Sequence, residues 1–344
     1  MLTGKKEFQS SFRNTRAGLA LAIVTGSAGY AITWAIQSPL LDPLLAALIL
    51  GIALKSSIPG NKKFGPGVML ASSIFIPVGI VFYGLHNLNF AKLTEVAPVK
   101  LLLLIVVMVV YFTVIIFLGK LLKLKKQITF LTAAGSAICG ASAIAVVSPA
   151  VEAEPDDVSI SLLSVALSAF IGFALVLPFT AALFDLTCNN YCFMSGATLQ
   201  FTGLVKVASK YAPFLSKEMQ PDEMLSFALS IKAVRYLGLL VAIPLLSSFV
   251  KNKLTAPWFL WAFLAAGLLG TWLYTNQKIF FQATLAPYIQ FVHTFSWSIA
   301  MSAIGLNADV KGLLSYSGSK SLIVAFTGFI AATAVFLAGL YFIN

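Results

Sequence analysis

The stretch AGSAICGASAIAVVSP, residues 134–149, decides what kind of fold this chain adopts. It is apolar enough to lie in a membrane, but Gly135, Gly140 and Pro149 oppose a uniform helix, because glycine costs about 1 kcal/mol and proline about 3 kcal/mol relative to alanine in a helix interior. In lipid, a backbone amide that leaves the helix must find another partner, so irregular backbone survives only inside protein or beside a polar cavity. An interrupted apolar segment of this kind therefore indicates the binding site of a membrane transporter.

The composition of the whole chain agrees with a membrane location. Of 344 residues, 59% are hydrophobic and only 10% are charged, and the mean hydropathy is +0.93, which excludes an ordinary soluble domain. Apolar windows of about twenty residues recur and predict an all-α polytopic membrane protein with about eleven transmembrane helices. The expected spans are 17–37, 41–57, 66–86, 100–119, 128–152, 158–184, 191–211, 223–250, 256–275, 281–307 and 321–343. The second and seventh of these are the weakest, so ten spans are the alternative.

The distribution of charge predicts the orientation in the membrane. Basic residues gather in alternate loops and before the first span, at Lys5, Lys6, Arg13 and Arg16. By the positive-inside rule, residues 1–16 form a cytoplasmic tail and residues 17–344 form a single transmembrane domain of the cell inner membrane. The net charge of +11 then reflects topology and contact with anionic lipid rather than binding of nucleic acid.

A second segment repeats the pattern of the first. SGATLQFTGLVKVASKY, residues 195–211, combines glycines with hydroxyls, an amide and a cation. The polar residues of interest there are Thr198, Gln200, Thr202 and Lys206, which follow or flank Gly196. This composition predicts a second interrupted helix near 195–209, although glycines that merely allow close helix packing are the alternative.

Two cations lie where a membrane helix should carry none. Lys232 and Arg235 occupy the middle of an apolar helix at a spacing of three residues, which places them on one face. Charges at this depth are usually functional, and the apolar stretch 225–246 that carries them contains no carboxylate to neutralise them. The sequence leaves two interpretations open: they bind a substrate anion, or they form structural ion pairs with acids such as Asp185 or Glu152.

The chain also contains a weak internal repeat. IVFYGLHNLNFAKL, residues 80–93, resembles IAMSAIGLNADVKGL, residues 299–313, and the expected topology places them on opposite sides of the membrane, as in an inverted repeat. His86 is expected at an outer edge. His293 lies near the tenth span and is either a hydrogen-bonded packing residue or, with Lys206, a candidate for ion coupling.

No pattern indicates catalysis. The sequence has no HExxH, GxSxG or phosphate-binding GxxxxGK[ST] motif, and Cys188 and Cys192 lack companions for a metal site. We therefore expect a protein that is not an enzyme and that requires no cofactor or metal.

Three of the motifs described above, together with the rest of the chain, resemble a known family. SAICGASAI at 136–144 with Pro149, SGATLQFTGLVKVAS at 195–209 and SIKAVRYLGLLVAIPLL at 230–246 are similar to the sulfate exporter family of YeiH-like membrane proteins, over nearly the whole chain. The resemblance implies a secondary transporter related to the cation:proton antiporter and bile-acid-symporter-like folds. Such folds have a scaffold, a core bundle, inverted repeats and two broken helices that cross near mid-membrane. Where the family tends to have His-Asp, this chain has Gln200 and Phe201, which argues against proton coupling through that pair.

These observations together predict a secondary transporter of a small anion, such as sulfate, a sulfonate or a carboxylate. Breaks near Gly140 and Gly196 would create half-helix N-termini, whose free amides would bind the anion with help from nearby hydroxyls and cations. The predicted substrate-binding residues are Ser136, Gly140, Ala141, Ser142, Gly196, Thr198, Gln200, Thr202, Lys232 and Arg235. An anion channel and a membrane sensor or scaffold with a vestigial site are the alternatives. Besides the anion, the expected partners are membrane lipid and a second copy of the chain in a homodimer.

Overall fold

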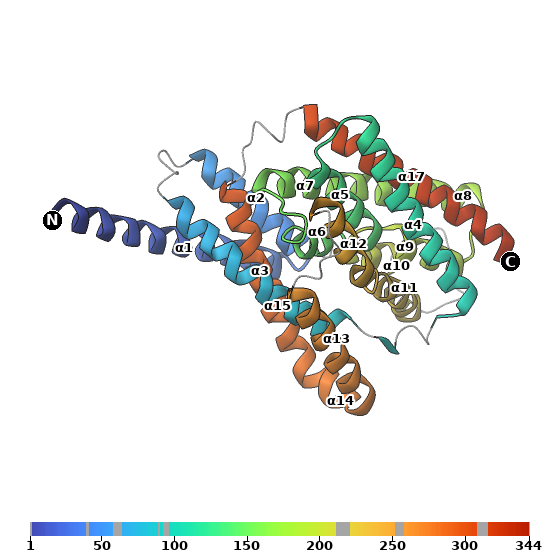
Figure 1. Cartoon of the computed structure of the whole chain (residues 1–344). Coiled ribbons are helices and arrows are strands. Elements are labelled where there is room, and N and C mark those ends of the chain that lie inside the picture. The colour runs from blue at the N-terminus through green and yellow to red at the C-terminus, as the bar shows by residue number, and fades with distance from the viewer. Residues whose placement is uncertain are drawn as a thin grey trace.

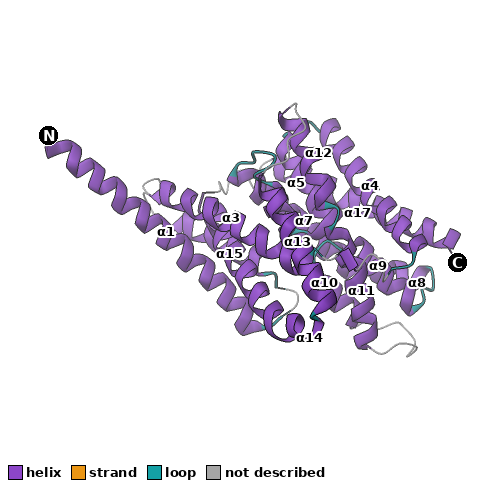
Figure 2. Ribbon diagram, turned by 60° about the horizontal axis from the view of Figure 1, so that its bottom comes forward, coloured by secondary structure: helices purple, strands orange, loops and turns teal. Residues whose placement is uncertain are grey.

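The computed structural model describes residues 2–38, 41–57, 64–88, 90–91, 96–210, 221–251, 258–307 and 316–343, and within these ranges it contains helices and connecting loops but no strand (Figure 2). This confirms an all-α polytopic membrane protein. In the described ranges, seven helical stretches are long and apolar enough to cross a membrane: Asn14–Ile36, Gly65–Asn87, Pro98–Leu121, Pro155–Leu183, Glu223–Lys251, Trp258–Asn276 and Ser317–Ile343. The expected span 41–57 is a shorter helix, and those at 128–152 and 191–211 are interrupted.

The helices form two bundles that lie side by side (Figure 1). In the first bundle, helix α15 packs against α1, α2 and α3, and α13 covers another side of α3. The bounds of these helices are α1 Leu2–Ile36, α2 Pro43–Ser57, α3 Gly65–Asn87, α13 Trp258–Asn276, α14 Lys278–Phe280, the π-helical turn η5 Phe281–Leu285 and α15 Ala286–Asn307.

The second bundle contains both interrupted segments. Helix α17 packs along α4 and α7, while α11 packs against α9 and α10. The bounds are α4 Pro98–Leu121, α5 Lys126–Ala134, η3 Gly135–Cys139, α6 Ala141–Val147, α7 Pro155–Ile171, η4 Gly172–Val176, α8 Leu177–Leu183, α9 Cys188–Thr198, α10 Thr202–Lys210, α11 Pro221–Tyr236, α12 Leu239–Lys251 and α17 Tyr316–Ile343. The arrangement in two bundles agrees with the expected scaffold and core.

The long helices are apolar on every side, as expected where one face meets the bundle and the other meets lipid. In α4, Leu104, Val107 and Tyr111 are fully buried, whereas Leu102 and Phe117 on other faces are more than half exposed. A helix that is hydrophobic all round does not suit an aqueous surface and is typical of a membrane span. The predicted inverted repeat stays a prediction, since residues 308–313 of its second copy lie outside the described ranges.

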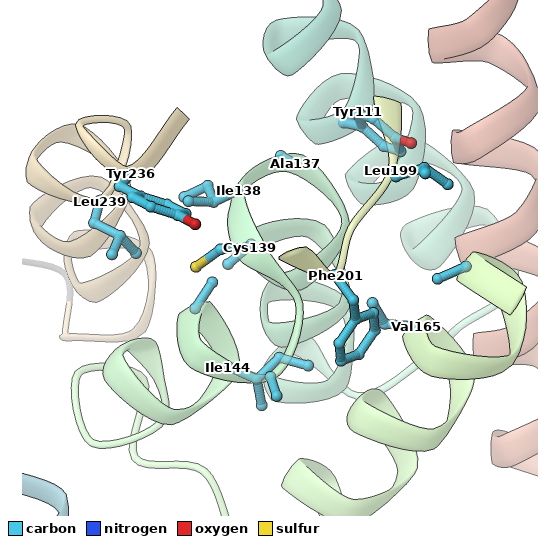
Figure 3. Packing of buried hydrophobic residues seen from close by; sticks show 14 of the residues in the cluster. Tyr111, Ala137, Ile138, Cys139, Ile144, Val165, Leu199, Phe201, Tyr236 and Leu239 are labelled. Atoms are coloured by element: carbon cyan, nitrogen blue, oxygen red, sulfur yellow. The ribbon is translucent and has the colours of Figure 1, made fainter. Parts of the chain in front are cut away.

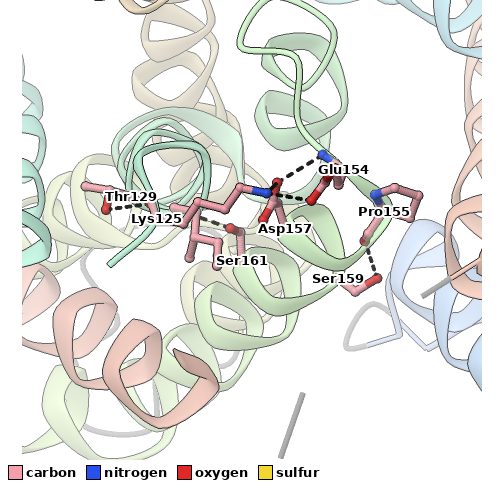
Figure 4. A network of polar contacts seen from close by, with 8 residues as sticks. Lys125, Thr129, Glu154, Pro155, Asp157, Ser159 and Ser161 are labelled. Atoms are coloured by element: carbon pink, nitrogen blue, oxygen red, sulfur yellow. Dashed lines mark hydrogen bonds and ion pairs between the residues drawn. The ribbon is translucent and has the colours of Figure 1, made fainter. Parts of the chain in front are cut away.

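A polar network fixes the start of α7 at one end of the second bundle (Figure 4). Glu154 and Asp157 form a reciprocal capping box, in which the Asp157 carboxylate accepts a hydrogen bond of 3.0 Å from the Glu154 amide. The Lys125 ammonium contacts both carboxylates, at 2.6 Å and 2.9 Å, and these contacts raise the pKa of Lys125 and lower that of Glu154. The network therefore links the start of α5 to that of α7.

We expect Asp157→Ala to lower the stability of the purified protein by about 1 kcal/mol, the usual cost of losing a helix cap. Asp157 is buried, and its carboxylate accepts from the Glu154 amide and pairs with Lys125, so alanine leaves that amide without its acceptor and leaves Lys125 with Glu154 alone. Thermal unfolding in detergent measures the change. Glu223→Ala, which removes an exposed carboxylate near the start of α11, is the matched control and should shift the midpoint little.

Candidate functional site

The first interrupted segment breaks at Gly140. Helix α5 ends in the π-helical turn η3, and Gly140 follows with φ 66° and ψ −125° before α6 begins. This conformation is accessible to glycine and strained for residues with a Cβ atom, which explains why the chain carries glycine there. The break predicted from residues 134–149 is thus present.

The second interrupted segment breaks three residues later than predicted. Helix α9 continues through Gly196 to Thr198, and Leu199, Gln200 and Phe201 form the non-helical link to α10. A Cβ atom on Gly196 would lie only 2.5 Å from the Ala228 carbonyl oxygen of α11. The placement of a half-helix end at Gly196 was therefore wrong: this glycine allows α9 and α11 to pack closely.

The two breaks touch each other. The Phe201 ring lies against Gly140, with three ring carbons 3.1 Å from where a Cβ of residue 140 would stand. Figure 3 shows the link that carries Leu199 and Phe201 beside the end of the first half-helix at Ala137, Ile138 and Cys139. The interrupted helices therefore meet at their breaks, as the family resemblance implies.

Lys232 and Arg235 join the two half-helices at this meeting point. Lys232 donates to the carbonyls of Ile138 at 3.0 Å, Leu199 at 2.6 Å and Gln200 at 2.8 Å. Arg235 donates to the carbonyls of Ser136, Ala137, Gly196 and Leu199, at distances from 2.7 to 3.2 Å. Most of these carbonyls lie at helix C-terminal ends, which lack intrahelical donors and carry partial negative charge. We call this arrangement the carbonyl clamp.

The carbonyl clamp differs from both interpretations that the sequence left open. Lys232 and Arg235 are fully buried, and the three donors of the ammonium group are all used by backbone carbonyls. In this conformation neither belongs to the lining of the cavity described below, and neither forms an ion pair with a carboxylate among the described residues. Glu152 instead pairs with Lys251 at 3.4 Å, and Asp185 is exposed. In this conformation the two cations bind the ends of the broken helices, and their assignment to an anion site stays a prediction.

A cavity of about 460 Å³ lies where the two bundles meet. One wall comes from α2, α3 and α15 of the first bundle, and the other from η3, α6, α10 and α11 of the second. Its size suits a small ligand with its water, since ligand pockets usually range from about 300 to 1,000 Å³. A ligand bound in this cavity would therefore contact both helix bundles.

The wall from the second bundle suits an anion. Thr202 and Gly203 form the first turn of α10, and Lys206 follows one turn later on the same side. The positive end of the helix dipole and the ammonium group therefore act on the same space. Ser142 adds a hydroxyl from α6, and Thr202 exchanges a hydrogen bond of 2.9 Å with the Tyr236 hydroxyl. Lys206 is exposed, so water reaches this wall.

The wall from the first bundle carries the two histidines of the chain. The ring centroids of His86 on α3 and His293 on α15 are 5.5 Å apart. The Tyr83 ring makes an edge contact with His293, with ring centroids 5.7 Å apart, and its hydroxyl donates to the Cys139 sulfur at 3.2 Å. Tyr83 therefore connects the histidine pair with the first broken helix. Asp42 lies at the start of α2 and accepts hydrogen bonds from the Leu44 and Leu45 amides.

The predicted site residues therefore divide into two groups. Ser142, Thr202, Lys206 and His293 line the cavity. Ser136, Gly140, Ala141, Gly196, Thr198, Gln200, Lys232 and Arg235 belong to the breaks and their packing, outside its lining. Thr198, for example, turns its hydroxyl to the Met194 carbonyl at 2.7 Å.

Sequence reasoning missed several lining residues. Asp42, Tyr83, His86 and Tyr236 all line the cavity, and His86 lies half-buried beside His293 in the last turn of α3. The polar run His86–Asn87 at the end of an apolar helix was the signal available for His86.

Comparisons with known proteins place the chain among membrane proteins. The family model described as Conserved hypothetical protein 698 matches residues 17–325. The UPF0324 membrane protein of Archaeoglobus fulgidus is 27% identical over 320 residues, which cover 93% of this chain and 90% of that protein. The UPF0324 inner membrane protein YeiH of Escherichia coli K12 is 27% identical over 322 residues, which cover 90% and 88%. No solved structure matches the chain.

Proposed function

The chain belongs to the family described as Conserved hypothetical protein 698, and from this membership and the geometry of the cavity we propose that it is a secondary transporter of a small anion across the cytoplasmic membrane. One observation carries the proposal. The cavity lies between two helix bundles and receives, from the broken helices, the first turn of α10 with Thr202, Gly203 and Lys206.

Charge favours an anion as the ligand. Lys206 is the one lining cation among the described residues, while the Asp42 carboxylate is already engaged by two backbone amides of its own helix start. Free amides at a helix N-terminus and an ammonium group are suited to sulfate, sulfonate or carboxylate oxygens. The unpartnered Nε2 atom of His293, a side chain that is 9% exposed, is a further polar group on the opposite wall.

The two bundles supply the movement that transport requires. Because the ligand contacts both bundles, rocking or sliding of one against the other would expose the cavity first to one side of the membrane and then to the other. The carbonyl clamp holds the broken helices together, so the Ser142 and Thr202 regions would move as one unit.

Counterflow in proteoliposomes tests the proposal. Vesicles that contain purified protein and are loaded with unlabelled sulfate should take up external labelled sulfate faster than unloaded vesicles, because a carrier returns faster when it is loaded. Sulfonates and carboxylates are tested in the same way. Flux without such acceleration would indicate an anion channel, and saturable binding without flux would indicate a sensor or scaffold; either result contradicts the proposal.

We expect Lys206→Met to weaken anion binding about 10-fold or more, which corresponds to the loss of one charge-assisted contact worth about 1.5–3 kcal/mol. The unfolding temperature without ligand should change little, because Lys206 is exposed. Calorimetric titration with sulfate measures the affinity. Lys278→Met is the matched control: it removes the same charge from an exposed position outside the cavity and should leave the affinity unaltered.

A further inference from the structure

His86 and His293 form a pair with unused hydrogen-bonding capacity. Their rings are 5.5 Å apart and inclined at 39°, and they come from α3 and α15, which pack side by side. His86 Nδ1 and His293 Nε2 are both buried and without a hydrogen-bond partner in the described part of the chain. The remaining nitrogen of His293, Nδ1, lies 3.3 Å from the Thr294 hydroxyl.

Packing contacts account for the positions of the imidazole rings, but they do not account for the nitrogen atoms that lack a hydrogen-bond partner. His293 makes edge contacts with Tyr83 at 5.7 Å and Trp297 at 5.8 Å, and these contacts hold the imidazole in place. A buried polar atom without a partner is costly, however, and such atoms are few in native proteins. Two such nitrogen atoms, on histidines that line one cavity from neighbouring helices, indicate a ligand that the pair takes up.

The charges around the pair limit what that ligand can be. The ionisable groups that share the cavity with the pair are Asp42 on α2, Tyr83 on α3, Cys139 on η3, Lys206 on α10 and Tyr236 on α11. On the far side of α3, α13 presents the apolar ring of Phe263, which stacks with Tyr83. No three His, Cys, Asp or Glu side chains in the described part of the chain lie close enough together to hold a metal ion, whereas a proton needs only one imidazole nitrogen.

We propose that His86 and His293 are the proton-binding site of this chain, and that the pair takes up one proton together with the anion. Two imidazolium rings this close, with Lys206 in the same cavity, would repel one another, so the second proton is excluded. The anion at the first turn of α10 supplies the compensating negative charge, so each ligand strengthens the binding of the other. The coupling to transport, an anion–proton symport, rests on the proposed function; the proton site itself does not.

The proton site can be measured directly, because the chain contains only two histidines. Full-length protein purified without a histidine tag and labelled with ¹⁵N-histidine should give two imidazole spin systems. On acidification we expect both rings to respond over the same pH range, with a total uptake of one proton. In His86→Gln, the remaining ring should titrate singly and at a different pH, and His293→Gln should behave reciprocally. Independent titration that is unaltered by the second replacement would overturn the shared site.

Addition of sulfate tests the link to the anion. In weakly buffered solution with a pH-sensitive dye, binding of sulfate to the wild-type protein should remove protons from the medium, and sulfate should raise the pH at which the rings titrate. The double variant His86→Gln/His293→Gln should lose this uptake. Sulfate binding without proton uptake in the wild type would refute the coupling but leave the transporter proposal standing. Absence of sulfate binding, with a normal shared titration, would refute the proposed function for sulfate while the proton site stands.

Discussion

Arg235→Met is expected to lower the stability of the protein by at least about 1–3 kcal/mol, the usual cost of leaving even one buried hydrogen-bonding group without its partner. The guanidinium group donates to the carbonyls of Ser136, Ala137, Gly196 and Leu199, which belong to two different half-helices. Methionine fills similar volume but donates nothing, so these acceptors remain buried without that donor. Unfolding in detergent, followed by helical circular dichroism and by size-exclusion chromatography of heated samples, measures the loss.

Arg235→Lys separates charge from geometry. Lysine keeps the positive charge but lacks the planar fork that reaches several carbonyls at once, so we expect a loss of stability between wild type and methionine. Lys232→Met should also destabilise, and the double variant should cost less than the sum of the two, because both cations bind the Leu199 carbonyl.

Anion affinity distinguishes the carbonyl clamp from a binding role for Arg235. Lys206→Met should weaken sulfate binding with little change in stability, whereas Arg235→Met should first of all lower stability. If Arg235→Met kept the unfolding temperature of the wild type and lost sulfate binding selectively, the guanidinium would contact the anion in another conformation. The interpretation of Arg235 as part of a structural clamp would then be wrong.

The class of fold and the existence of both breaks could be predicted because their causes are local. Runs of apolar residues reveal membrane helices, and Gly140 and its neighbours reveal a place where the helix cannot continue. The second break was predicted in the right segment but at Gly196 rather than at Leu199–Phe201. A glycine that ends a helix and one that lets a neighbour approach look alike in sequence, and only the contact with Ala228 separates them.

The partners of the buried cations and the lining of the cavity could not be predicted, because they depend on helices far apart in the chain. Lys232 and Arg235 were correctly singled out as unusual, but their partners are backbone carbonyls, which every residue possesses and no pattern reveals. His86 and His293 are separated by more than half of the chain and meet only because α3 packs against α15. In the sequence, Asp42 looks like an ordinary helix cap, and its place in the cavity lining follows only from the way the helices pack.

Gly140→Ala is expected to destabilise the protein by at least about 1–3 kcal/mol, the usual cost of holding a residue with a side chain in a conformation reserved for glycine. Gly140 has φ 66° and ψ −125°, and the new methyl group would also lie 3.1 Å from three carbons of the Phe201 ring. The break must therefore shift, and with it the meeting point of the two half-helices. We expect a lower unfolding temperature together with reduced sulfate counterflow.

Two further variants divide this effect into its causes. Gly65→Ala is the matched control, since a Cβ atom there meets nothing within 4 Å, and it should leave stability and counterflow near wild type. Phe201→Leu in the Gly140→Ala background removes the ring contact but not the backbone strain, so it should restore stability only in part. Full restoration would mean that the contact with Phe201, and not the conformation of Gly140, requires glycine at the break. A Gly140→Ala protein with unaltered stability and counterflow would contradict the proposed geometry of the crossing itself.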